Sequence, residues 1–365
     1  MKINEVVNFL ETLAPPFLQE GYDNAGLITG NSSCECTGAL TTLDCIPQTI
    51  DEAIRTNCNL VIAHHPIIFK GLKKITGKNY VEETIIKAIK NDIAIYAIHT
   101  NLDNVLNGVN DVIARKLNLE NKKILSPKSG ILQKLAVHVP ETHKDELANA
   151  LYNAGAGSIG KYRECSFQIS GIGTFKPGEG SNPFSGAKGI RQTEPETKLE
   201  LVFPKWKQRE ILNSMWKNHP YEEVAYDIFD IINDISDYGS GVIGELINPL
   251  SEIDFLKFVK DQFKLNVIKH TSLLGRNIKK VAVCGGAGFF LLNNAISAGA
   301  DVFITSDVKY HEYFDASGII LLADIGHYES EQFTIEFLYD KLRENFPNFA
   351  VLKTAVVTNP VHYFT

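Results

Sequence analysis

Short runs of consecutive apolar residues, each followed by a polar or glycine-rich turn, constrain the fold of this chain most. In the first third they alternate with helical patterns, as LVIA (60–63) and IAIYAI (93–98) do. The same style returns in the last third in VAVC (281–284), VFIT (302–305) and IILLA (319–323). Strands that are apolar on both faces are typical of parallel sheets covered by helices. Both thirds are therefore predicted to form α/β layers with largely parallel sheets.

The middle of the chain has a different pattern. Its strand-like runs alternate or carry β-branched residues, and helical patterns occur only at 143–154 and 205–217. The strand-like runs are LAVHVP (135–140), SFQISGIG (166–173), KLELVFP (198–204) and VAYDIFDI (224–231). This order of strand, helix, two strands, helix and strand is that of a ferredoxin-like α+β module. In a chain of 365 residues we therefore expect a domain of residues 129–235, inserted into an α/β core of residues 1–128 and 236–365.

Charge and composition argue against several classes of protein. The net charge of −7 does not indicate nucleic-acid binding, which normally needs a basic surface. No run approaches the roughly 20 apolar residues of a membrane helix, and the N-terminus lacks the apolar region of a secretory signal. The six cysteines are scattered without paired C-x-x-C units. We therefore expect a cytoplasmic protein without a membrane partner.

Histidines and carboxylates follow three of the apolar runs. The residues are His64 and His65 after LVIA, His99 and Asp103 after IAIYAI, and His327 and Glu331 after IILLADIG. Open α/β sheets bind ligands outside the carboxyl ends of their strands. The three groups are therefore expected to converge on one crevice.

The spacing within these groups suits metal binding. The pair His99 and Asp103 and the pair His327 and Glu331 are each four residues apart, so a helical turn places both members on one face. Imidazoles with carboxylates suit zinc, iron, manganese, cobalt or nickel, whereas calcium and magnesium prefer oxygen ligands. Three of the imidazoles with the two carboxylates already make five ligands, more than the three that one open catalytic zinc requires, which favours two ions about 3.5 to 4 Å apart. The alternative is that His64-His65-Pro66 forms a structural turn and that His327 and Glu331 are solvent-exposed polar residues at the start of a helix.

Two further stretches allow more than one interpretation. The segment VCGGAGFF (283–290) either cradles an anion with backbone amides or packs a strand tightly against a helix. It lacks the lysine and hydroxyl residue of a P-loop, which favours packing. Asp307, Lys309 and His311 either line the crevice and contact a substrate or form a solvated helix start.

Six motifs in order also resemble a known family, the Nif-three-like proteins, which are widely named GTP cyclohydrolase I type 2 homologues. The motifs are YDNAGL (22–27), HHP (64–66), HTNLD (99–103), GGAG (285–288), TSDVKYHEYFDA (305–316) and GHYESE (326–331). The middle segments GAGSIGKYRECSF, GIGTFKP and HPYEEVAYDI look like the inserted module of the longer bacterial members, which is similar to PII and CutA proteins. Tyr22, where the family commonly has tryptophan, and Ser306, where it commonly has glycine, are departures that touch no expected ligand.

The resemblance implies a two-part Nif-three-like α/β core with an inserted ferredoxin-like (PII/CutA-like) α+β domain. It implies two divalent metal ions per chain, with zinc expected as isolated and iron, manganese, cobalt or nickel as alternatives. The implied ligands are His64, His65, Asp103, His327 and Glu331. The carboxylates of Asp103 and Glu331 are candidates to bridge the ions. His99 would orient a ligand or a bound water, or donate a proton.

The implied function is a metal-dependent hydrolase resembling GTP cyclohydrolase I type 2 homologues. It would act through a metal-activated water on a nucleotide-like or phosphoester substrate. The alternative is a non-enzymatic metal-binding or regulatory scaffold in which the inserted domain senses a small-molecule or nucleotide ligand. The resemblance also implies a homo-oligomer, a ring-shaped hexamer.

Overall fold

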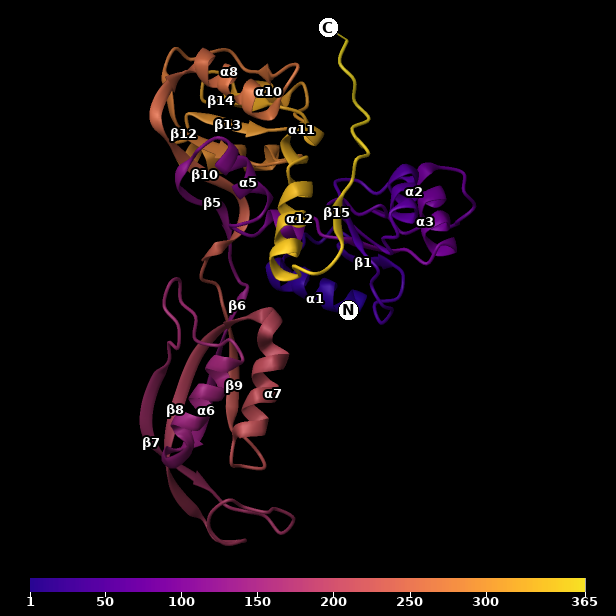
Figure 1. Cartoon of the computed structure of the whole chain (residues 1–365). Helices are drawn as coiled ribbons and strands as arrows, with labels where there is room; N and C mark the ends of the chain where they lie inside the picture. The colour runs from indigo at the N-terminus through magenta and orange to yellow at the C-terminus, as the bar shows by residue number, and fades with distance from the viewer. Residues whose placement is uncertain (365) are drawn as a thin grey trace. The chain divides into compact units, whose positions relative to one another are not determined.

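A computed structural model describes residues 1–364, and Figure 1 labels many of its helices and strands. The chain divides into two units, one of Met1–Pro127 with Asp237–Thr365 and the other of Lys128–Ser236. The first unit contains two sheets, and the second contains one.

The first sheet of the larger unit has five strands in the order β1-β4-β3-β2-β15. Its strands are β1 (Gly26–Thr29), β2 (Ala39–Thr42), β3 (Leu60–Ala63), β4 (Ala94–Ala97) and β15 (Val351–Lys353). The helices that precede, connect or follow them are α1 (Ile3–Leu13), α2 (Pro47–Arg55), α3 (Tyr80–Lys90), α4 (Thr100–Asp103) and α12 (Thr334–Asn345), with a 3₁₀ turn at Pro16–Leu18. Every residue of β2, β3 and β4 is buried, as the apolar runs predict.

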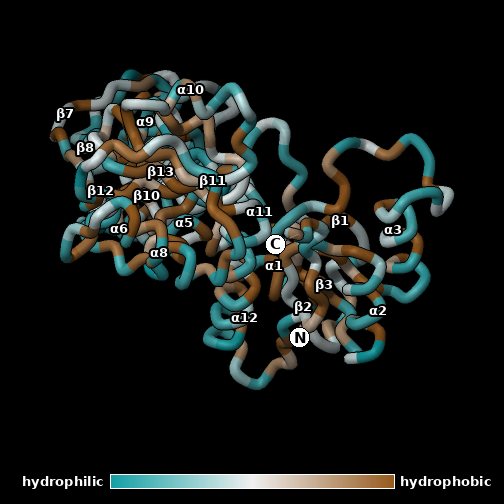
Figure 2. The backbone as a smooth tube through the Cα atoms, turned by 90° about the horizontal axis from the view of Figure 1, so that it is seen from above, coloured by the Kyte–Doolittle hydropathy of each residue, from teal (hydrophilic) through white to brown (hydrophobic). Residues whose placement is uncertain are grey.

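The second sheet has six strands in the order β11-β14-β13-β12-β10-β5. They are β5 (Glu120–Lys128), β10 (Ile235–Ser251), β11 (Lys269–His270), β12 (Asn277–Val283), β13 (Val302–Thr305) and β14 (Leu321–Asp324). The helices are α5 (Val109–Lys116), α8 (Glu252–Phe263), α9 (Leu292–Ser297), α10 (Glu312–Ala316) and α11 (His327–Glu331), with a 3₁₀ turn at Phe289–Leu291. Figure 2 shows hydrophobic residues along the central strands of this sheet and along β2 and β3.

Both sheets are parallel at their centres and antiparallel toward an edge. In the first, β15, β2, β3 and β4 are parallel and β1 is antiparallel to β4. In the second, β12, β13 and β14 are parallel, whereas β10 is antiparallel to β12 and β11 is antiparallel to β14. The antiparallel strands β1 and β11 contain no buried residue, and β10 mixes buried with exposed and intermediate positions, so these strands lack the fully apolar runs that marked the central strands.

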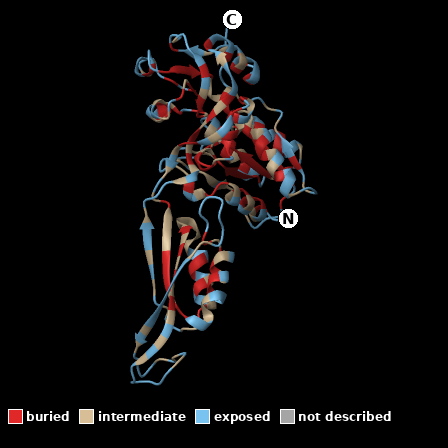
Figure 3. Ribbon diagram, turned by 90° about the vertical axis from the view of Figure 1, so that its left-hand side faces the viewer, coloured by how far each residue is buried: buried red, intermediate tan, exposed pale blue. Residues whose placement is uncertain are grey.

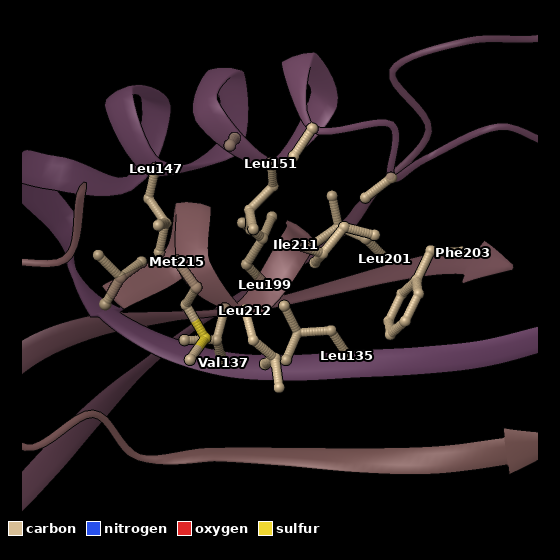
Figure 4. Close-up of a cluster of buried hydrophobic side chains, with 14 residues drawn as sticks. Leu135, Val137, Leu147, Leu151, Leu199, Leu201, Phe203, Ile211, Leu212 and Met215 are labelled. Atoms are coloured by element: carbon tan, nitrogen blue, oxygen red, sulfur yellow. The ribbon is translucent and has the colours of Figure 1, made fainter. Parts of the chain in front are cut away.

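The smaller unit is a four-stranded sheet in the order β7-β8-β6-β9, antiparallel throughout. Its elements, in chain order, are β6 (Leu132–Pro140), α6 (Lys144–Asn153), β7 (Phe167–Phe175), β8 (Gln192–Pro204), α7 (Gln208–Asn218) and β9 (Tyr226–Ile231), with 3₁₀ turns at Glu141–His143 and Lys205–Lys207. Leu147 and Leu151 of α6 pack with Met215 of α7 over Leu199 and Leu201 of the sheet (Figure 4). In Figure 3 the buried residues of this unit lie where helices meet the sheet. This unit therefore has a hydrophobic core of its own.

No helix in the part of the chain that the structure describes has the length and apolar character needed to cross a membrane.

Candidate metal centre

The six histidines and carboxylates singled out in the sequence lie together in the larger unit. His64 and His65 follow β3, His99 and Asp103 begin and end the segment of α4 after β4, and His327 and Glu331 bound α11 after β14. The strands β3 and β4 are parallel neighbours, so their carboxyl ends deliver the first four residues to one edge. Ring centroids of His64 and His99 are 5.3 Å apart, and those of His65 and His327 are 5.1 Å apart. The two sheets thus contribute to a single cluster.

Glu331 lies between two groups of potential ligands. Its Oε2 atom is 3.0 Å from Nε2 of His65 and 3.0 Å from Nε2 of His327. Its Oε1 atom is 3.9 Å from Nε2 of His64, which is itself 3.6 Å from Oδ1 of Asp103. Within each group, the potential ligand atoms lie within 4.8 Å of one another. The arrangement therefore offers two three-ligand sets that share one carboxylate.

His64 and His65 are oriented by their Nδ1 atoms. The carbonyl oxygen of Ile98 accepts from Nδ1 of His64 at 2.8 Å, and Oδ1 of Asp44 lies 2.7 Å from Nδ1 of His65. Oδ2 of Asp44 in turn accepts from the hydroxyl of Thr358 at 2.6 Å. With each Nδ1 engaged by an oxygen, the proton of the neutral ring is assigned to Nδ1, and Nε2 presents its lone pair to the centre.

His99 and His327 are held in the same way. Nδ1 of His99 lies 2.8 Å from Oδ1 of Asp23, whose other oxygen accepts from the amide and hydroxyl of Thr100. Nδ1 of His327 lies 2.7 Å from Oδ2 of Asp307. Carboxylates in this position fix ring orientation and make the opposite nitrogen a better ligand. His99 also belongs to a third compact group of potential ligands, with His64 and His65.

Two buried atoms of the cluster test whether a cation fits. Nε2 of His64 and Oδ1 of Asp103 have no hydrogen-bond partner among the described residues. Because the Ile98 carbonyl can only accept, neutral His64 has no proton on Nε2 to donate to Asp103. A lone pair and an anionic oxygen that face each other repel, and a cation between them removes that repulsion. The donor set of imidazole nitrogens and carboxylate oxygens therefore fits a divalent transition-metal ion.

The electrostatics of the cluster favour positive charge at its centre. Burial lowers the pKa of His65, but its contacts with Asp44 and Glu331 raise that pKa to about 10. Burial likewise opposes charge on His327, whose contacts with Glu331 and Asp307 raise its pKa to about 9. Burial raises the pKa of Glu331, but the neighbouring imidazoles hold it well below its usual range. The same negative charge that holds protons on these imidazoles attracts a divalent cation, which must displace the Nε2 protons to bind.

The exposure of the side chains shows which side of the cluster faces solvent. The side chain of His64 is fully buried, whereas that of His327 is 40% exposed. Phe69, half-exposed, lies edge-on to His99 with ring centroids 5.5 Å apart. The cluster is therefore open past His327 and past the segment that follows His65.

The glycine-rich loop after β12 packs on Glu331. A Cβ atom on Gly286 would lie 2.5 Å from Oε1 of Glu331, and Gly286 has φ +60°. The amides of Gly285, Gly286 and Gly288 donate to the side chains of Asn110, Ser330 and Thr305 respectively. These amides are engaged inside the protein, so the close-packing interpretation of this loop holds.

The C-terminal segment joins the surroundings of the two ligand groups. After β15 the chain continues in extended form past α11 (Figure 1). Thr358 holds Asp44 beside the first sheet, and the next residue, Asn359, donates to Glu329 of α11 at 3.1 Å. Glu52 of α2 accepts from the hydroxyl of Thr354 and the amide of Ala355. The segment thus links residues that position His65 with the helix that carries Glu331.

Sequence reasoning missed several of these residues. Asp44 ends the run ALTTLD after β2, so its place at a strand end was the signal that it could reach the cluster. Asp23 lies in the motif YDNAGL (22–27), which carried the family resemblance but is not at a strand end, and Thr358 is separated from Asp44 by most of the chain. Two of the residues that the sequence offered as lining the crevice differ in their contacts. Asp307 contacts His327, whereas Lys309 pairs with Glu312 at the start of α10.

Comparison with known proteins finds relatives that match nearly the whole chain in sequence and in fold. The family model Duf34/NIF3 (NGG1p interacting factor 3) matches residues 1–360. The GTP cyclohydrolase 1 type 2 homolog of Bacillus subtilis is 40% identical over 326 residues, 89% of this chain and 87% of that protein. That of Halalkalibacterium halodurans is 39% identical over 360 residues, 98% of this chain and 96% of its own. The crystal structure of a Bacillus cereus protein related to NIF3 matches with TM-score 0.87 and 35% identity, over 100% of this chain and 99% of that chain.

Proposed function

The chain belongs to the Duf34/NIF3 family, and on that premise we propose that it holds two divalent metal ions and acts as a metal-dependent hydrolase. The observation that carries the proposal is the position of Glu331 between two ligand sets. One ion would be held by His65, His327 and Glu331. The other would be held by His64, Asp103 and Glu331, with Glu331 as the bridging carboxylate.

The ligand chemistry narrows the choice of ion. Three imidazoles and two carboxylates suit zinc, iron, manganese, cobalt or nickel. Zinc is the expected ion in the isolated protein because it accepts both ligand types without a demand on geometry. When bound, such a pair of ions lowers the pKa of a water molecule and stabilises developing negative charge on oxygen.

The residues of the chain supply orientation and proton transfer. Asp44 and Asp307 hold His65 and His327 by Nδ1, so their Nε2 atoms stay directed at the centre. His99 stands outside the two sets that share Glu331, and its Nδ1 faces Asp23. Burial raises the pKa of Asp23, but its contacts with His99 and Thr100 lower it to about 2, so this carboxylate remains ionised. We assign His99 as the group that donates a proton to the leaving atom through Nε2, with Asp23 stabilising its charged form.

The substrate class follows from the relatives and from the open side of the cluster. Relatives of this chain carry the name GTP cyclohydrolase 1 type 2 homolog. We propose a nucleotide-like or phosphoester substrate that reaches the centre past His327 and Phe69, where the side chains are exposed.

The smaller unit is proposed to be a ferredoxin-like domain similar to PII and CutA proteins. The order β6-α6-β7-β8-α7-β9 and the hydrophobic core between helices and sheet support this assignment. We also propose a cytoplasmic homohexamer, as family membership implies. Sedimentation velocity of the full chain tests the hexamer, and a monomer at micromolar concentration would contradict it.

Turnover by the metal-loaded protein tests the proposed function. Nucleotides and phosphoesters are screened with wild-type protein and with His99→Gln, and metal content is measured on the same samples. We expect hydrolysis by the wild type, with lower kcat and unchanged metal content in the variant. Glu329→Gln is the matched control, because Glu329 lies in α11 but points to Asn359. A metal-loaded protein without turnover would instead favour the alternative, a metal-binding or regulatory scaffold whose smaller unit senses a ligand.

A further inference from the structure

We propose that residues 70–78, the segment that follows the two adjacent histidines, bind the phosphate groups of a small phosphorylated ligand beside the metal centre. The proposal rests on the proposed function, because it assigns the charged part of the substrate of that centre. It adds the residues that recognise this part: Lys70, Lys73 and Lys74.

The segment has an unusual charge for this protein. It reads KGLKKITGK and holds four lysines and no acidic residue, in a chain whose net charge is −7. All four lysines are exposed. Their side chains form no ion pair in the part of the chain that the structure describes. Four unpaired ammonium groups within nine residues repel one another, so an anion that binds among them relieves this repulsion.

The beginning of the segment is fixed at the metal centre. Phe69 lies with its ring 5.5 Å from that of His99. The carbonyl oxygen of the preceding residue, Ile68, accepts from the side chain of Asn24 at 2.7 Å. Asn24 directly follows Asp23, the carboxylate that holds His99. Lys70 therefore begins next to residues that line the centre.

The end of the segment is fixed as well. The carboxylate of Glu82 in α3 accepts from the amide of Thr76 at 2.7 Å, from its hydroxyl at 2.8 Å and from the amide of Lys78 at 3.1 Å. These contacts lower the pKa of Glu82 to about 2, so the carboxylate stays charged and the contacts persist at neutral pH. A loop held at both ends presents residues 70–75 with a smaller loss of entropy on binding than a free loop would.

Charge at the centre explains why a phosphorylated ligand needs this segment. The carboxylates of Asp23, Asp44, Asp103, Asp307 and Glu331 surround the histidines. Two divalent ions bring four positive charges against these five negative charges, which leaves the centre without an excess of positive charge. In the glycine-rich loop, the amides of Gly285, Gly286 and Gly288 already donate to protein side chains. Lysine ammonium groups, which bind phosphate as point charges, supply the missing attraction.

The test measures binding of inorganic tripolyphosphate to the full chain by calorimetry, with metal content determined before and after the titration. The variant K70A/K73A/K74A is compared with wild type and with K257A/K260A/K279A. The control has the same change of net charge, and its lysines are exposed on α8 and β12. We expect about tenfold weaker binding in the first variant, from three exposed charge contacts, and unchanged binding in the control. The variant K70R/K73R/K74R, which keeps the charges, should bind as wild type does.

Each outcome has a distinct meaning. The protein can hold metal and yet bind no tripolyphosphate, or bind it equally in both alanine variants. Either result overturns the lysine site and leaves the metal centre standing. Lysine-dependent binding without any bound metal supports the lysine site and overturns the metal centre. Binding of a single-stranded oligonucleotide that is tighter than that of tripolyphosphate and is lost in the same variant overturns the assignment of a small ligand.

Discussion

Replacing Asp44 by asparagine should loosen one of the two proposed metal ions. The carboxylate of Asp44 uses one oxygen for Nδ1 of His65, at 2.7 Å, and the other for the hydroxyl of Thr358, at 2.6 Å. Asparagine has nearly the same shape but only one acceptor oxygen. Either His65 or Thr358 then faces an amide that donates, so His65 loses its charged partner, its fixed orientation or both.

The size of the effect follows from two independent ranges. Loss of a group that orients a metal-bound histidine typically lowers metal affinity about 10- to 100-fold. Tenfold corresponds to about 1.4 kcal/mol, and a hydrogen bond to a charged group contributes about 1.5 to 3 kcal/mol, so the two ranges agree. We therefore expect about 10- to 100-fold weaker binding of the ion at His65, His327 and Glu331. The ion at His64 and Asp103 should be affected less.

Competition with a zinc chelator measures both affinities. Asp51→Asn is the matched control, because Asp51 forms an ion pair with Lys87 on the surface and such pairs contribute at most about 1 kcal/mol. Thr358→Val removes only the outer contact and should weaken the same ion by less than Asp44→Asn does. If folded Asp44→Asn protein binds both metal ions with wild-type affinity, the reasoning that this carboxylate acts through His65 is refuted.

Three other predictions concern backbone, pH and thiols. Gly286→Ala should lower metal content and destabilise the fold by roughly 1 to 2 kcal/mol, since the new Cβ would lie 2.5 Å from Oε1 of Glu331 and φ is +60°. Metal analysis and chemical denaturation measure these effects, and an unchanged metal content with an unchanged free energy of unfolding would contradict the prediction. The pKa of Glu82 is depressed to about 2, so its contribution is present above its usual pKa and lost as pH falls toward 2. The difference in free energy of unfolding between wild type and Glu82→Gln should accordingly shrink over that interval, and a constant difference would count against it. Exposed Cys34 should react with a thiol reagent in the native protein, whereas buried Cys45 should react only after unfolding, because burial raises its pKa to about 12. Mass spectrometry of labelled peptides measures this, and equal labelling of the two cysteines in the native protein would contradict the prediction.

The central strands could be predicted because burial leaves a clear pattern. The runs at 60–63 and 302–305 coincide with β3 and β13, since a strand covered on both faces must be apolar at every position. The strands β1, β5 and β11 could not be predicted in this way. Each of them carries at least one exposed residue, and their pairing is decided by neighbours distant in sequence.

The cluster of histidines was accessible from sequence for a related reason. Parallel strands of one sheet end at the same edge, so polar residues after neighbouring buried runs are candidates for a shared site, as His64 after β3 and His99 after β4 are. His327 follows β14 of the other sheet, and its place in the cluster depends on how the two sheets pack. The groups that orient them were less accessible. Asp307 was a candidate to line the crevice, but its contact with His327 was not predicted; Asp44 lies near a strand end with ordinary surroundings in sequence, and the role of Thr358 depends on a contact across 314 residue positions. Such contacts follow from tertiary packing, which local patterns do not encode.

Metal content per chain tests the central claim most directly. Protein without an affinity tag, purified without added metal, is analysed by mass spectrometry of the elements, alongside His65→Ala and Glu331→Gln, with circular dichroism to verify folding. The proposed centre predicts about two divalent ions per wild-type chain and fewer in both variants, with the larger loss in Glu331→Gln because both ligand sets share that carboxylate. Wild-type protein that holds no metal and takes up none on reconstitution, or folded variants that keep the wild-type content, would contradict it.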